Sequence, residues 1–178
     1  MPIHVMHDIE TLGTGNDPVV LSIGAVKFDG DQIIDRFHVG IDPKDSQRLG
    51  LKIDAETVLW WLDPDRAEAR AALLALPKVD LFSALDGYAM WLRGDQPVTG
   101  SAWANGATFD HIKLRSSYDA CKLDYPFQFR DEECYRTMKN RFRDVPFNRI
   151  GTHHGALDDA ESQAVHLQEI CKAHGIKL

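Results

Sequence analysis

Cysteine and long apolar runs are both scarce in this chain. Its 178 residues include three cysteines, an odd number without a Cys-x-x-Cys pair, which excludes a disulfide framework and a zinc knuckle. We expect these cysteines to be reduced, buried thiols. No apolar run approaches the ~20 residues of a membrane span, and the start lacks the basic and long apolar regions of a secretory signal. The sequence therefore predicts a soluble, cytoplasmic protein that does not bind membranes.

Basic residues are in the minority. The chain has 20 Lys and Arg against 27 Asp and Glu, a net charge of -7, which at first argues against a nucleic-acid ligand. Carboxylates that cluster to hold cations contribute to such an excess, and the bound cations reverse its local sign. A solvated helix face or a phosphate-facing surface could explain the one basic run. Its members are Arg130, Arg136, Lys139, Arg141, Arg143 and Arg149.

The residue patterns predict a single α/β domain over residues 1–178. β-branched and apolar runs, separated by turn residues, predict strands at 3–9, 19–28, 33–41, 97–104 and 125–131. Helical spacing and capping residues predict helices at 54–62, 65–76, 79–93, 109–121, 134–142 and 158–173. A tight turn at 29–31 makes the first three strands an antiparallel meander. The order of these elements indicates a mixed sheet.

Four carboxylates and one histidine are the most informative side chains. Asp8 and Glu10 are two apart on a predicted strand, so they share one face, where unpaired charges are costly to bury. Asp110 and Asp159 lie near predicted helix starts, where an acid can also act only as a cap. His154 lies in a Gly-containing loop that lets its imidazole reach a metal site. Together they form the inventory of a two-metal nuclease, with anionic oxygens for hard cations and one group that takes a proton near neutral pH.

These residues resemble the three motifs of the DEDDh branch of the DnaQ-like 3′-to-5′ exonucleases. Asp8-Ile-Glu10 matches the first motif, Asn105 to Asp110 the second, and His154-Gly-Ala-Leu-Asp-Asp159 the third, in the same order. The compact length and the segments Trp60-Trp61-Leu62 and Trp103-Ala-Asn105-Gly are similar to the phage DexA and Rv2179c-like exoribonuclease group. The resemblance spans residue 3 to about 173.

This resemblance implies both a fold and a mechanism. The fold is a ribonuclease H-like α/β fold with a mixed five-stranded sheet, flanked by helices, whose first three strands are antiparallel. Asp8, Glu10, Asp110 and Asp159 would hold two Mg²⁺ or Mn²⁺ ions, and His154 would be the general base. The substrate would be the 3′ end of a single-stranded nucleic acid, with RNA favoured over DNA, and the products nucleoside 5′-monophosphates. Many relatives pair, so a homodimer is also possible.

The candidate substrate-binding residues adjoin the motifs. Aromatic side chains stack on bases whatever their identity, which suits an exonuclease. The candidates are Thr11, Leu12, Trp61, Trp103, Asn105 and Phe109. Adjacent helix positions face different ways, so we expect one of Trp60 and Trp61 in the core and the other at a substrate groove or a subunit contact.

The third motif can be aligned in two registers, because Asp158 precedes Asp159. We expect Asp159 to be the metal ligand and Asp158 to cap the last helix. His153 is less favoured as the base than His154, and His7 should point to the strand face opposite Asp8.

Two other functions fit parts of this sequence. An HD-type phosphohydrolase would use His7-Asp8, His111 and the paired histidines at 153–154, but that class builds its metal site on helices. A nucleic-acid-binding module that lost its chemistry is the second alternative. The complete set of four carboxylates and one histidine argues against it.

Overall fold

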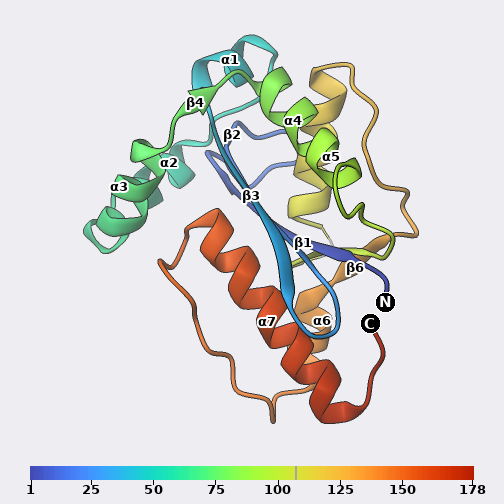
Figure 1. Ribbon diagram of the computed structural model, residues 1–178. Coiled ribbons are helices and arrows are strands. Elements are labelled where there is room, and N and C mark those ends of the chain that lie inside the picture. Colours follow the sequence, from blue (N-terminus) through green and yellow to red (C-terminus); the bar gives the residue numbers. More distant parts are fainter. Residues whose placement is uncertain (107) are drawn as a thin grey trace.

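The computed structural model describes residues 1–106 and 108–178. Its centre is a six-stranded sheet with the order β4-β3-β2-β1-β5-β6 (Figure 1). The strands are β1 (His4–Thr11), β2 (Val20–Phe28), β3 (Ile33–Ile41), β4 (Lys78–Val79), β5 (Ala102–Ala104) and β6 (Glu132–Cys134). The helices are α1 (Pro43–Arg48), α2 (Ala55–Leu62), α3 (Ala67–Ala75), α4 (Leu81–Arg93), α5 (Asp110–Ala120), α6 (Tyr135–Arg141) and α7 (Ala156–His174), and the short 3-10 helix η1 (Pro64–Arg66) joins α2 to α3.

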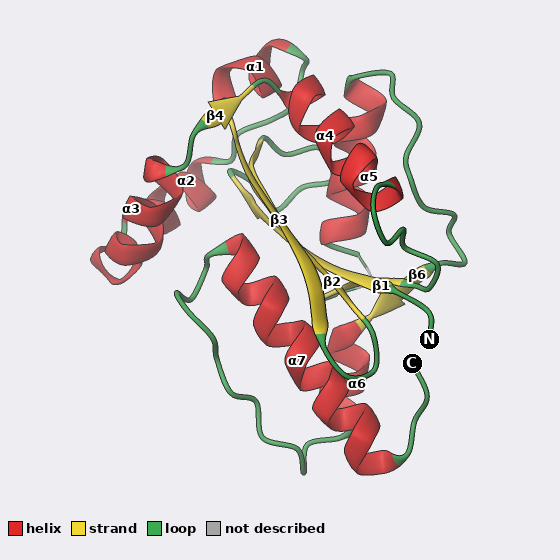
Figure 2. Ribbon diagram, viewed as in Figure 1, coloured by secondary structure: helices red, strands yellow, loops and turns green. Residues whose placement is uncertain are grey.

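The antiparallel meander of β1, β2 and β3 is confirmed. β4, β5 and β6 are parallel to their neighbours β3, β1 and β5, so the sheet is mixed. Helices cover both faces, with α7 and α6 on one side and α4 and α5 on the other (Figure 2). Side chains on β1 alternate between these layers: Val5 and Ile9 pack in the layer with α4 and α5, whereas Met6 packs in the layer with α7.

The close contact between β2 and the start of α7 is made at Gly24. This residue pairs with Asp8 across the β1–β2 ladder. A Cβ atom at this position would lie 2.1 Å from the backbone nitrogen of Leu157, so only glycine fits. The first turn of α7 therefore lies directly over the part of the sheet that carries Asp8.

The sheet has six strands, one more than the sequence predicts. β4 has two residues and lies where the sequence predicted the start of a helix; it forms because Asp42 donates its amide to the Val79 carbonyl beside the end of β3. β6 lies at 132–134 rather than at 125–131, and α7 begins at Ala156 rather than at 158. Elements of two or three residues contain too few positions to show a periodic pattern.

The fold gives three further findings. Among the described residues, no helix is long and apolar enough to cross a membrane. Of the three cysteines, Cys171 is buried as expected, whereas Cys121 and Cys134 are half-buried. His7 and Asp8 lie on β1 and not on the helices that an HD-type site requires, so that alternative fails.

Candidate active site

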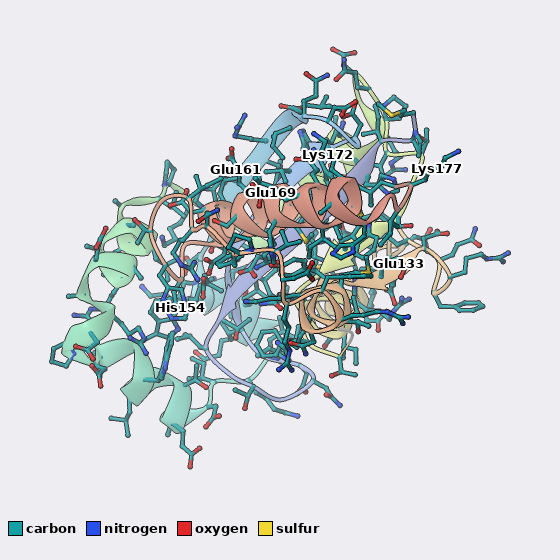
Figure 3. The ribbon with its side chains drawn as sticks, turned by 90° about the horizontal axis from the view of Figure 1, so that it is seen from below. Glu133, His154, Glu161, Glu169, Lys172 and Lys177 are labelled. Carbon is teal, nitrogen blue, oxygen red and sulfur yellow. The ribbon has the colours of Figure 1, made fainter. Side chains whose placement is uncertain are left out.

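A cleft of about 540 Å³ opens where β1 and the starts of α5 and α7 meet α2 and α6. It brings together all four predicted carboxylates and the predicted base. The sequence-predicted residues that line it are Asp8, Glu10, Thr11, Trp61, Asn105, Phe109, Asp110, His154 and Asp159. Figure 3 shows His154 on the loop ahead of α7, on the side of the molecule where α2 and α3 lie. Ala107, inside the second motif, lies outside the described residues.

Three of the carboxylates converge closely. Asp8, Glu10 and Asp159 each place an oxygen within 4.8 Å of the others. Asp110 is tied to the same strand, because its Oδ1 accepts the Ile9 amide at 3.3 Å. On the α7 side, Gln163 donates its side-chain amide to Asp8 Oδ1 at 3.0 Å. The first and third motifs thus meet through β1 and α7, and α5 adds the second.

Burial makes this cluster electrostatically unfavourable without a counter-charge. Burial, and then the neighbouring carboxylates, raise the pKa values of Asp8 and Glu10 well above their usual range. Burial raises the pKa of Asp110 to about 7. The Arg149 guanidinium pairs with Asp159 but not with the other three. Four oxygen-donor groups whose anions repel one another fit a hard divalent cation, which supplies the missing positive charge.

The loop ahead of α7 holds His154 in a constrained conformation. Its backbone has a φ of 65°, and its amide donates to Asp159 Oδ2 at 3.1 Å. The ring stacks on His153, with centroids 3.7 Å apart, and lies at a right-angled contact with Trp60. Burial, and then His153, lower the pKa of His154 to about 4. The imidazole is therefore neutral at pH 7 and able to accept a proton.

Asp158 does not cap the last helix, contrary to the prediction. The N-cap of α7 is Gly155, and among the described residues no side chain caps it. Asp158 instead accepts the Thr152 amide at 2.7 Å and lies against Gly151, whose φ is 66°. This carboxylate therefore shapes the loop that carries the two histidines, while Asp159 faces the cleft.

Trp60 and Trp61 differ in exposure, as expected for adjacent positions on a helix. Trp61 is 5% exposed and donates its indole N–H to the Thr11 carbonyl at 2.9 Å, so it forms the floor of the cleft. Trp60 is 37% exposed, and the Arg66 guanidinium lies 4.6 Å from its ring centroid. The sequence predicts Trp61 as a substrate contact, but Trp60 is the more accessible wall of the cleft.

Two predicted substrate contacts lie away from the cleft lining that the structure describes. Trp103 is 8% exposed and packs with Tyr135 and Ala160 in the apolar layer beneath α7. Leu12 packs against the core on the opposite side of the sheet. Their proximity to motif residues along the chain did not place them in the cleft, because each side chain points into an apolar layer.

Half of the predicted basic run lines the cleft. Arg136, Lys139 and Arg149 do so, and Arg136 donates to the Asn105 carbonyl at 2.6 Å. The Phe147 ring lies 4.5 Å from the Lys139 ammonium and 5.4 Å from the Arg149 guanidinium. The sequence motifs do not predict Phe147 in the cleft, since nothing local marks a loop aromatic as an active-site residue. The remaining members, outside the described lining, are Arg130, Arg141 and Arg143.

A family model decides the classification of the chain. The model of the 3′-5′ exoribonuclease Rv2179c-like domain matches residues 3–171. The chain belongs to this family. The Rv2179c-like protein is thus a 3′-5′ exonuclease, and the family predicted from its motifs is confirmed. A search of curated proteins finds no match for it.

Solved structures of DEDDh exonucleases share the fold of this Rv2179c-like exonuclease. The nuclease domain of 3′hExo, a DEDDh family member bound to rAMP, has a TM-score of 0.69 at 14% identity over 99% of this chain and 95% of that one. Exonuclease X, in complex with 5′ overhanging duplex DNA, gives 0.58 at 17% over 97% and 93%. Exonuclease I from Methylocaldum szegediense gives 0.68 at 13%; the match covers 98% of this chain but 41% of that one. At these identities the likeness establishes the fold.

Proposed function

We propose that this exonuclease removes nucleoside 5′-monophosphates from the 3′ end of single-stranded RNA, with residues 1–178 acting as one catalytic domain. The observation that carries the proposal is the convergence of Asp8, Glu10, Asp110, Asp159 and His154 in one cleft. RNA is favoured by the family description, which names an exoribonuclease. Among the structural neighbours, one structure concerns recognition of a histone mRNA stem-loop by a 3′-exonuclease, and Exonuclease X was solved with DNA.

The four carboxylates are the proposed ligands of two Mg²⁺ or Mn²⁺ ions. Asp8, Glu10 and Asp159 are close enough to share an ion, and Asp110 adjoins them through Ile9. When bound, such ions lower the pKa of a water molecule and neutralise charge on the phosphate. Gln163 holds one oxygen of Asp8, which leaves the other free to face the cleft.

His154 is the proposed general base. Its neutral imidazole takes the proton of the water that attacks the terminal phosphodiester, and the 3′ oxygen of the penultimate nucleotide leaves. The hydrogen bond from its amide to Asp159 fixes the backbone, and the edge contact with Trp60 limits rotation of the ring. The base is thereby held beside the carboxylate cluster.

The two walls of the cleft differ in chemistry, and in our proposal this difference sets the orientation of the bound nucleic-acid strand. Arg136, Lys139 and Arg149 form a cationic wall that suits phosphates, whereas Trp60 forms an aromatic wall that suits bases, with Trp61 at the floor. Phe109, Thr11 and Asn105 also line the cleft and are the proposed contacts of the terminal nucleotide. A duplex end cannot offer its bases to one wall without unpairing, so a single strand is the expected substrate.

A degradation assay tests the proposal. 5′-labelled single-stranded RNA and DNA, with free or blocked 3′ ends, are incubated with Mg²⁺, Mn²⁺ or EDTA. We expect a ladder that shortens from the free 3′ end, faster on RNA and absent with EDTA. Asp110→Asn should abolish the ladder, whereas Asp119→Asn, an exposed acid on the same helix, should not. Internal cutting, or undiminished activity of Asp8→Ala and His154→Ala, would contradict the mechanism.

A further inference from the structure

A second set of metal-ligating atoms lies at the mouth of the same cleft. His153, His154 and Asp159 each offer one donor atom, and these three atoms lie within 4.8 Å of one another. Two of the donors are imidazole nitrogens, in contrast to the all-oxygen set of Asp8, Glu10 and Asp159. The two sets have one member in common, Asp159. An ion held by the histidine set therefore takes an oxygen of a carboxylate that the all-oxygen set also uses.

We propose that His153, His154 and Asp159 form an inhibitory site for a borderline divalent ion, with Zn²⁺ as its occupant. Imidazole nitrogens suit Zn²⁺, Ni²⁺ and Cu²⁺, whereas Mg²⁺ prefers carboxylate, carbonyl and water oxygens. Two nitrogens and one carboxylate oxygen match the ligand sets that hold Zn²⁺ with one position left for water. The donor types thus separate this site from the carboxylate site next to it.

The loop conformation places the three groups close to one another. The His153 and His154 rings stack with an angle of 19° between their planes. The bond from the His154 amide to Asp159 and the bond from Thr152 to Asp158 fix the backbone of the loop. Asp159 is mostly buried, with 13% of its side chain exposed, so the least mobile ligand anchors the site.

Two adjustments are needed for an ion to bind. Zn²⁺ holds its ligands at about 2.0–2.2 Å, so donor atoms must lie within roughly 4 Å of one another. Parallel rings do not aim their nitrogens at one point, and the exposed His153 ring is the one free to turn. Arg149, which pairs with Asp159 Oδ1, must also release that oxygen or share the carboxylate with the ion.

Occupation of this site would remove two groups from the reaction. The ion would take the lone pair of His154, the proposed base, and an oxygen of Asp159, a proposed ligand of the catalytic ions. Zn²⁺ should therefore inhibit even when Mg²⁺ is in excess. This inhibitory consequence rests on the proposed function, whereas Zn²⁺ binding itself does not.

Calorimetry tests the binding. Zn²⁺ is titrated into Asp8→Asn, in which the all-oxygen set is broken, and into the same variant carrying His153→Gln. We expect one ion to bind the first protein and at least about tenfold weaker binding to the second, since loss of even an outer-shell partner costs 10–100-fold. The matched control carries Asp8→Asn with His174→Gln, at the far end of α7 beside Asp144. Equal Zn²⁺ affinity in all three proteins would overturn the site.

Inhibition is measured separately, at fixed excess Mg²⁺, as the Zn²⁺ concentration that halves the rate of each protein relative to its own Zn²⁺-free rate. We expect this concentration to rise at least about tenfold in His153→Gln relative to the parent, for the same loss of a ligand. Equal inhibition of both proteins would overturn the proposal. If the parent degrades no nucleic acid, the proposed function fails, and calorimetry still decides whether the site exists.

Discussion

Gly24 sets how closely α7 approaches the carboxylates on β1. The residue pairs with Asp8, and the backbone of Ala156 and Leu157 fills the space where a side chain would be. A single missing Cβ therefore controls the distance between the first motif, on β1, and the third motif, on α7. No sequence motif of the site includes this glycine, yet the geometry of the cluster depends on it.

Gly24→Ala should destabilise the protein and inactivate it together. The new methyl would lie 2.1 Å from a backbone atom that cannot rotate away, so α7 must shift, at a cost of about 3 kcal/mol or more. Chemical denaturation and the RNA assay measure the two effects. Gly87→Ala is the matched control: it lies in α4 with nothing within 4 Å, and should stabilise by about 0.5–1 kcal/mol. A Gly24→Ala protein of parental stability would show that the contact is not restrictive.

At the scale of elements, α6 contributes Arg136 and Lys139 to the cationic wall of the cleft. Arg136 and Lys139 are three apart on this helix, so both reach the cleft. Arg141, the last residue of α6, and Arg143, two residues further on, are exposed and lie outside the described cleft lining. Arg141 and Arg143 are therefore a matched control for Arg136 and Lys139, because they are basic residues of the same region that lie outside the cleft.

Arg136→Gln combined with Lys139→Gln should weaken RNA binding and leave catalysis of bound substrate largely intact. Each lost phosphate contact reduces the slope of the logarithm of the binding constant against the logarithm of the salt concentration by about one. We expect KM to rise about tenfold and the dependence of binding on salt to flatten. Kinetics at several salt concentrations measure both, and Arg141→Gln with Arg143→Gln should match the parent. If both double variants behave alike, the wall has no role in binding.

The sequence predicted long elements and motifs better than side-chain placement. The period of two on β1 correctly put Asp8 and Glu10 on one face, because strand geometry is local. Trp103 was assigned to the substrate from its position beside Asn105, but it packs beneath α7. That outcome depends on which layer each strand face meets, which is a property of the tertiary fold. The role of Trp60 at the cleft wall likewise depends on a distant loop, the one that carries His154.

At the scale of the whole molecule, the carboxylate cluster links stability to pH and to metal. Burial raises the pKa values of Asp8 and Glu10, and raises that of Asp110 to about 7. A carboxyl group with a raised pKa in the folded state stabilises the fold below its unfolded pKa, near 4, and that contribution is lost as pH rises through the folded value. His154, whose pKa is lowered, contributes in the opposite direction at acid pH.

The effect of Mg²⁺ on Tm isolates the contribution of the cluster. In EDTA, Asp110, whose pKa burial raises to about 7, is ionised at pH 8 and protonated at pH 5. Mg²⁺ binds only the ionised form, so millimolar Mg²⁺ should raise Tm by several degrees at pH 8 and by little at pH 5.

Asp110→Asn removes one repelling charge while its amide oxygen can still accept the Ile9 N–H. Its Tm in EDTA at pH 8 should exceed that of the parent, although it is inactive. Thermal scans of both proteins at the two pH values measure this, and a Mg²⁺ shift of the same size at pH 5 and pH 8 would contradict the linkage. That result would make stability and catalysis independent at this site. The buried, mutually repelling carboxylates predict instead that the site that binds the ions lowers the stability of the ion-free protein.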